Sequence, residues 1–183
     1  GSDRRTATEA SVEDLTRVHP AAHVQAVFDA APGAGQARLD ADTYVNPVSF
    51  EIALLAAGGM ITAVDAVAGG SADHALAVVR PPGHHAVAGR GMGFCLFNNA
   101  AVAARYAQRA HGLDRVAIVD YDVHHGNGTN DIFYDDPSVL FISLHQYPLY
   151  PMQGLVQETG AGDGEGFTVN LPLPAGCGDA AYA

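Results

Sequence analysis

Residues 116–128 decide the fold, and they read VAIVDYDVHHGNG. The first four are a continuous apolar run, which is typical of a strand in a parallel sheet covered by helices on both faces. Polar residues follow at the point where this strand ends, and open parallel sheets carry their functional sites at that edge. We therefore predict an α/β protein with a site that begins at Asp120.

Helix and strand patterns alternate outward from this stretch. Strands are predicted over residues 74–79, 115–120, 139–144 and 167–171. A short helix is predicted from residue 11 onward, where a capping box marks its start. Further helices are predicted over 21–30, 47–68, 98–110 and 130–134. The helix over 47–68 is apolar on nearly every side, which predicts burial. Residues 39–44 and 80–97 are predicted loops, and the alternation favours a mainly parallel sheet.

Composition limits the class of protein. The 183 residues weigh 18.9 kDa, with 48% apolar and 16% charged residues, which predicts one globular domain over residues 3–183 and excludes a disordered chain. Gly1-Ser2 has the look of a cloning scar. The formal charge of -11 disfavours direct binding of nucleic acid or of an anionic membrane surface.

Other features point to a cytoplasmic protein. The two cysteines are too few for a disulfide framework, and the uncharged apolar run over 52–64 is shorter than the roughly 18 residues of a membrane span. No signal peptide is recognisable at the start of the sequence. Residues 178–183 stand where another crossover helix should begin, so the sequence reads as if cut within a domain.

The densest chemistry lies at the end of the 115–120 strand. Side chains alternate along an extended chain, so Asp120, Asp122 and His124 project to one side. Two carboxylates and an imidazole suit zinc, and equally iron, manganese or cobalt. The alternative is a solvated strand end with helix-capping acids.

A histidine pair follows the 74–79 strand. His84 and His85 could serve as general base and general acid at neutral pH, because imidazole titrates in that range. The alternative is two exposed loop histidines. Farther along, the glycines of residues 91–93 allow close backbone approach before the next helix.

Four motifs together resemble one family. They are RPPGHH at 80–85, GFCLFNN at 93–99, DYDVHHGNG at 120–128 and SLH at 143–145. In this order and at these spacings the chain resembles the zinc-dependent histone deacetylase and acetylpolyamine amidohydrolase superfamily, in its class II-like bacterial branch. The resemblance implies an arginase-like three-layer α/β fold, of which this chain would be the N-terminal half to two-thirds.

The resemblance also implies residue roles. Asp122 and His124 would be zinc ligands, and His84 and His85 the catalytic pair beside the metal-bound water. Asp120 would orient His84, and Asn127 would be the partner of His85. The walls of a narrow substrate tunnel would come from Gly93, Phe94 and Tyr150, with Asp42 and Thr43 on a loop that grips the substrate.

Further expectations come from the same resemblance. A structural K⁺ or Na⁺ would bind Asp120, Ser143 and main-chain oxygens of Asp122, His124 and Leu144, and a second ion would bind carbonyls of Phe133, Asp136, Val139 and Phe167. The reaction would remove an acetyl or other acyl group from a lysine side chain or a polyamine, releasing acetate and a free amine. A homo-oligomer is possible.

Two alternatives stay open. The family's third zinc ligand and its oxyanion-stabilising tyrosine or histidine would lie beyond residue 183, so the chain could be a binding module that keeps the acyl pocket without turnover. A manganese hydrolase on the same fold would need more aspartate ligands than the 120–128 stretch contains.

Overall fold

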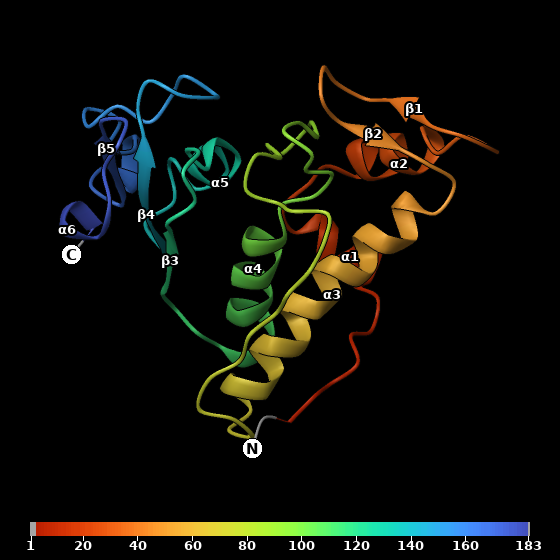
Figure 1. Cartoon of the computed structure of the whole chain (residues 1–183). Coiled ribbons are helices and arrows are strands. Elements are labelled where there is room, and N and C mark those ends of the chain that lie inside the picture. Colours follow the sequence, from red (N-terminus) through yellow and green to blue (C-terminus); the bar gives the residue numbers. More distant parts are fainter. Residues whose placement is uncertain (1–2, 183) are drawn as a thin grey trace. The chain divides into compact units, whose positions relative to one another are not determined.

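The computed structural model describes residues 3–182. It divides the chain into two compact units, Gly1–Leu113 and Asp114–Ala183. Each unit has its own elements, labelled in Figure 1. The sequence predicted one domain over residues 3–183, and this boundary stays a prediction.

The first unit is mainly helical. Its helices are α1 (Val12–Thr16), α2 (Ala21–Asp29), α3 (Ser49–Ala68) and α4 (Asn99–His111). They confirm the predicted helices to within about two residues. The predicted loop over 39–44 is instead bounded by a short antiparallel pair, β1 (Ala37–Arg38) and β2 (Tyr44–Val45).

Local side-chain contacts explain where two of these helices begin. The Ser11 hydroxyl accepts a hydrogen bond from the Asp14 backbone N–H, and the Asp14 carboxylate accepts one from the Ser11 N–H, which completes the predicted capping box. The Asn98 side chain accepts from the Ala101 N–H and so caps α4. Gly112, with a φ of 66°, ends α4 in the left-handed conformation.

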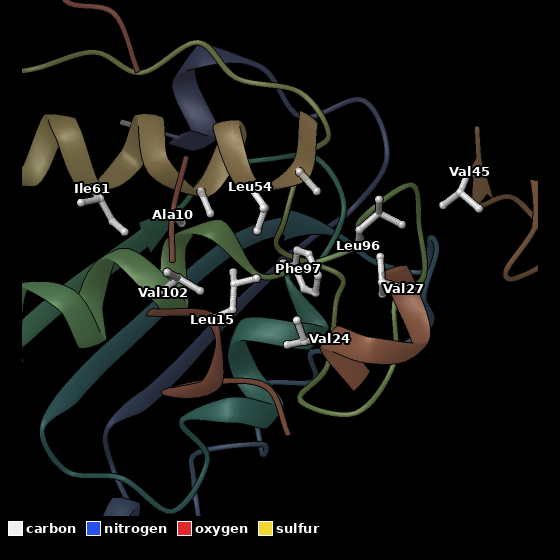
Figure 2. Close-up of a cluster of buried hydrophobic side chains, with 12 residues drawn as sticks. Ala10, Leu15, Val24, Val27, Val45, Leu54, Ile61, Leu96, Phe97 and Val102 are labelled. Atoms are coloured by element: carbon white, nitrogen blue, oxygen red, sulfur yellow. The ribbon is translucent and has the colours of Figure 1, made fainter. Parts of the chain in front are cut away.

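The core of the first unit lies where the helices meet (Figure 2). Leu15, Phe97 and Val102 are fully or almost fully buried there, and α3 packs beside α4. Gly58 of α3 lets the N-terminal segment approach, because a Cβ at this position would overlap the Thr8 carbonyl oxygen. Burial of apolar surface therefore holds the unit together.

Helix α3 departs from the sequence expectation in two ways. By length and composition, its 20 residues are apolar enough to cross a membrane. The sequence predicted no span, because the uncharged apolar run over 52–64 is shorter than a membrane span. The core helix of a soluble protein passes the same test. The predicted burial on nearly every side is wrong, because only one stripe packs into the core while Ile52 and Val67 are exposed.

The strand predicted over 74–79 is absent. These residues follow the turn after α3 as an extended segment without ladder pairing to any residue of the described chain. Leu76 and Val78 are almost fully exposed, whereas Val79 turns toward Gly59 of α3. The composition of the segment suits a strand, but a strand also needs a paired neighbour.

The second unit contains the parallel sheet. Its strands are β3 (Val116–Asp120), β4 (Val139–Gln146) and β5 (Thr168–Leu173), in the order β3-β4-β5 with parallel pairing. Helix α5 (Asn127–Ile132) connects β3 to β4 and begins three residues before the predicted 130. A 3₁₀ turn (Gly162–Gly164) precedes β5, and α6 (Asp179–Tyr182) follows it.

These strands confirm the predicted parallel pairing. The expectation that β3 is buried on both faces is wrong, because Ala117 and Val119 are exposed on one face. In β4 the side chains alternate, and the buried set includes Phe141, Ser143 and His145. The polar members of that set lie close to the carboxyl ends of the strands, which is the edge where the sequence predicts the site.

Candidate functional site

The predicted acid–base pair lies in the loop before α4. The rings of His84 and His85 are stacked at a tilt, with centroids 4.0 Å apart and planes at 42°. His85 is buried, with 5% of its surface exposed, and its backbone N–H points to the Cys95 sulfur at 3.4 Å. The alternative of two exposed loop histidines is therefore wrong for His85.

Asparagines at the start of α4 hold this loop. The Asn98 side chain donates to the Ala86 carbonyl at 3.2 Å, and the Asn99 side chain donates to the Pro81 carbonyl at 3.0 Å. Gly83 allows the close approach, because a Cβ there would lie 2.5 Å from the Asn99 backbone nitrogen. The GFCLFNN motif thus supports the histidine pair from the helix side.

The glycine of the same motif packs directly on His85. Gly93 has a φ of 57°, and a Cβ at this position would lie 2.5 to 2.8 Å from atoms of the His85 side chain. Only a glycine fits here without displacing the imidazole. The next residue, Phe94, also has a positive φ, 68°, and is 57% exposed.

The loop with Asp42 and Thr43 reaches Phe94. The Phe94 backbone N–H donates to the Thr43 hydroxyl at 3.1 Å, and this hydroxyl donates to the Asp42 carboxylate at 3.1 Å. Thr43 is buried, with 1% exposed. The structure therefore joins three predicted substrate residues of the first unit, Gly93, Phe94 and Asp42, into one contiguous set.

In the second unit, the predicted metal ligands follow β3. The Asp120 carboxylate accepts a hydrogen bond from the Asp122 N–H at 3.1 Å, and the Asp122 carboxylate accepts one from the His124 N–H at 2.8 Å. These turns bring alternate side chains to the same side. The Asp122 Oδ1 and His124 Nδ1 atoms are 3.2 Å apart.

The chemistry of this pair fits zinc. Zinc binds carboxylate oxygen and imidazole nitrogen, and here the two groups lie side by side in a direct contact of 3.2 Å. Asp122 and His124 are also partly exposed, so an ion can reach them. Within residues 3–182 no group of three or more His, Cys, Asp or Glu side chains is arranged to hold a metal.

Tyr150 lies beside this ligand pair. The residue is 37% exposed, and its ring meets the His124 ring edge to face, with centroids 6.2 Å apart. In this unit the structure thus brings together three predicted site residues, Tyr150, Asp122 and His124. Their roles as tunnel wall and zinc ligands stay predictions.

Next to the predicted ligands, His125 is a buried residue of the second unit. It is 1% exposed, and burial lowers its pKa to about 4, so the ring is neutral at pH 7. It packs on His145 at 4.6 Å between centroids, and His145 Nε2 donates to the Gly154 carbonyl at 2.9 Å. A Cβ at Gly154 would overlap ring atoms of both His125 and His145, so only a glycine fits at this position.

The residues expected to bind monovalent ions are partly brought together. Asp120 of β3 pairs in register with Ser143 of β4, so the first expected set shares one sheet edge. In the second set the Phe133 carbonyl accepts the Asp136 N–H at 3.1 Å, and the Phe167 carbonyl accepts the Phe141 N–H at 2.9 Å. A carbonyl oxygen has two lone pairs, so neither bond prevents binding of a cation. Leu144 and Val139 also lie on β4.

Comparison with known proteins settles the family. Residues 2–183 match the histone deacetylase domain family. The chain belongs to this family. A crystal structure of the HDA15 HD domain matches 92% of this chain and 48% of its own, with a TM-score of 0.88 and 45% identity, which confirms the deacetylase-like α/β fold.

Several curated relatives carry related names. Histone deacetylase 14 of Arabidopsis thaliana is 47% identical over 94% of this chain, and a histone deacetylase-like amidohydrolase of Pseudomonas aeruginosa is 48% identical over 97%. Human polyamine deacetylase HDAC10 is 44% identical over 98%. The chain spans 43%, 47% and 28% of these proteins, respectively, so it corresponds to about half of the first two. The family resemblance is confirmed, and the relatives are not confined to bacteria.

Sequence reasoning missed several supporting residues. Asn98, Asn99 and Cys95 lie in a motif that it singled out, but their contacts with the histidine loop could not be derived from it. His19 was not singled out, although it contacts the same loop. The pairings expected between Asp120 and His84 and between Asn127 and His85 stay predictions.

Proposed function

We propose that the chain is part of a zinc-dependent deacetylase that removes acetyl groups from lysine side chains or polyamines. The observation that carries the proposal is the 3.2 Å approach of Asp122 Oδ1 and His124 Nδ1 at the end of β3, in a chain of the histone deacetylase family. Relatives named deacetylase, amidohydrolase and polyamine deacetylase support the same reaction class.

The proposed roles follow from the chemistry of each group. Asp122 and His124 would hold the zinc ion, which when bound polarises an amide carbonyl and lowers the pKa of its water. His84 and His85 would move protons, one taking a proton from the water and one delivering a proton to the leaving amine. Their stacked rings keep the two imidazoles at a fixed separation.

The substrate would be an acylated amine on a cationic arm. Phe94 and Tyr150 present exposed aromatic rings that suit an alkyl chain. Asp42, held beside the Phe94 backbone through Thr43, offers a carboxylate to a substrate amine or backbone N–H. The net charge of -11 favours a cationic substrate. Acetyl-lysine and acetylpolyamine both meet this description.

The remaining expectations are part of the proposal. Structural K⁺ or Na⁺ would bind around Asp120 and Ser143, and near Phe133 and Phe167. A cytoplasmic location, a homo-oligomer and the absence of nucleic-acid and membrane partners stay predictions. A binding module without turnover stays the second candidate.

Acetate release tests the proposal. An acetyl-lysine peptide and acetylspermidine are incubated with added zinc and either this chain or a longer form of the protein. We expect turnover in at least the longer form, with His85→Ala reducing it by about 100-fold or more, the range for a general acid or base. His74→Ala, at an exposed histidine of the same unit, is the matched control. Full activity of His85→Ala would contradict the proposed role, and no turnover in either form would favour the binding module.

A further inference from the structure

A buried histidine of the first unit contacts both ends of the loop that carries the candidate site. His19 is 0% exposed and follows α1. Its Nδ1 atom lies 2.8 Å from the Ala88 carbonyl oxygen, and its Nε2 atom accepts a hydrogen bond from the Asn98 backbone N–H at 2.9 Å. Between these two contacts the loop carries Gly93 and Phe94.

The two contacts determine the tautomer of His19. A backbone N–H can only donate, so Nε2 must present its lone pair to Asn98. A carbonyl oxygen can only accept, so Nδ1 must carry the proton and donate it to Ala88. His19 is therefore the neutral Nδ1–H imidazole, and a second ring proton would face the Asn98 N–H.

His23 adds a third connection to the same loop. Its Nε2 atom lies 2.9 Å from the Leu96 carbonyl oxygen and must carry the proton, for the same reason. The rings of His19 and His23 lie 5.1 Å apart, and both pack against Phe97, which Figure 2 shows within the hydrophobic core. Two imidazoles anchored in the core thus hold three backbone groups of the loop.

We propose that His19 is a positioning residue of the deacetylase site: by joining the Ala88 and Asn98 ends, it fixes the loop that presses Gly93 against His85 and presents Phe94. This inference rests on the proposed function for its meaning in catalysis. Gly93 and Phe94 both have positive φ, and a backbone conformation of this kind at a non-glycine residue persists only where its surroundings hold it. The bond from the Phe94 N–H to Thr43 is one such restraint, and the His19 contacts are others.

The surroundings of His19 agree with a ring that is neutral at pH 7. Burial lowers its pKa to about 4, although the backbone hydrogen bond to Ala88 acts in the opposite direction. His19 packs on the rings of His23 and Phe97 and contacts the backbones of Ala88 and Asn98. His23 is the titratable group of α2 that faces it.

Amide hydrogen exchange in the metal-free chain tests the proposal without any requirement for activity. In His19→Leu we expect the Asn98 amide to exchange at least about 10-fold faster than in the parent, because this buried donor loses its partner. The Phe94 amide should also exchange faster, because the loop that holds it against Thr43 loses two of its backbone anchors. The amide of Ala57 in α3 should change much less. His19→Gln, whose side-chain carbonyl can take the place of the Nε2 acceptor, should restore protection of Asn98 more than His19→Asn does.

Three results would overturn the inference. Uniformly faster exchange across the unit in His19→Leu would show a core-packing role alone, and unchanged exchange at Asn98 and Phe94 would show no role. If His19→Leu does not fold, ¹⁵N spectra of the parent imidazoles still decide, because a proton on Nε2 of His19 contradicts the assigned contacts. None of these results depends on whether the protein deacetylates.

Discussion

Replacement of Gly93 by alanine should damage the site through two separable costs. A left-handed backbone at a non-glycine residue costs about 1 to 2 kcal/mol. The added Cβ would also lie 2.5 Å from a ring atom of His85, which is buried and cannot move freely. Overpacking of this kind costs about 1 to 3 kcal/mol. We therefore expect Gly93→Ala to lower the free energy of unfolding by about 3 kcal/mol and to displace the His85 ring.

Two other glycines separate these costs. Gly112 has a φ of 66° but nothing within 4 Å of its Cβ position, so Gly112→Ala should show the backbone cost alone. Gly89, in the same loop as Gly93, has neither feature, and Gly89→Ala should be nearly neutral. Urea unfolding of the three variants measures the costs. The reasoning is refuted if Gly93→Ala is as stable as Gly112→Ala, or if the His85 ring signals in its NMR spectrum stay unchanged.

Three further outcomes are expected. Burial lowers the pKa of His19 to about 4, whereas the same side chain in the unfolded chain has a pKa near 6.5, so between pH 7 and 5 the unfolded state binds more protons. Through this group the free energy of unfolding should fall by about 2 kcal/mol from pH 7 to pH 5. Urea titrations of the parent and His19→Gln at both pH values check this, and an equal pH dependence of the unfolding free energy in the two proteins would contradict it. Asn98→Ala removes a helix cap and the bond to Ala86, so unfolding should become easier by about 1 to 3 kcal/mol, measured by thermal or urea denaturation. Thr43→Val keeps the shape but removes the acceptor of the Phe94 N–H, so KM for an acetyl-lysine peptide should rise more than kcat falls; a pure loss of kcat would argue against a substrate-loop role.

Local patterns in the sequence predicted most elements well. Capping residues and glycines marked the ends of helices, and Ser11 and Asp14 form the expected capping box. The apolar runs at 116–119 and 139–142 became paired parallel strands. The strand predicted over 74–79 was wrong, because strand formation depends on a paired neighbour, which the composition of a segment does not specify.

Contacts in the candidate site were likewise predictable where they are local in the sequence and unpredictable where they are not. The approach of Asp122 to His124 follows from their spacing along the chain and was predictable. The contact of Phe94 with Thr43 spans 51 positions, and that of Asn98 with His19 spans 79. Such contacts depend on how helices pack, so a lone histidine in the sequence gives no sign of them.

Zinc affinity tests the central claim most directly. We expect the chain to bind zinc in competition with a chelating dye, and Asp122→Asn and His124→Ala each to weaken binding by at least about 10-fold. Asp131→Asn, at an exposed aspartate of the same unit, should leave the affinity unchanged. X-ray absorption of the bound ion should show nitrogen and oxygen ligands, including one imidazole. Zinc affinity that is equal in the parent and in the variant lacking both Asp122 and His124 would contradict the account.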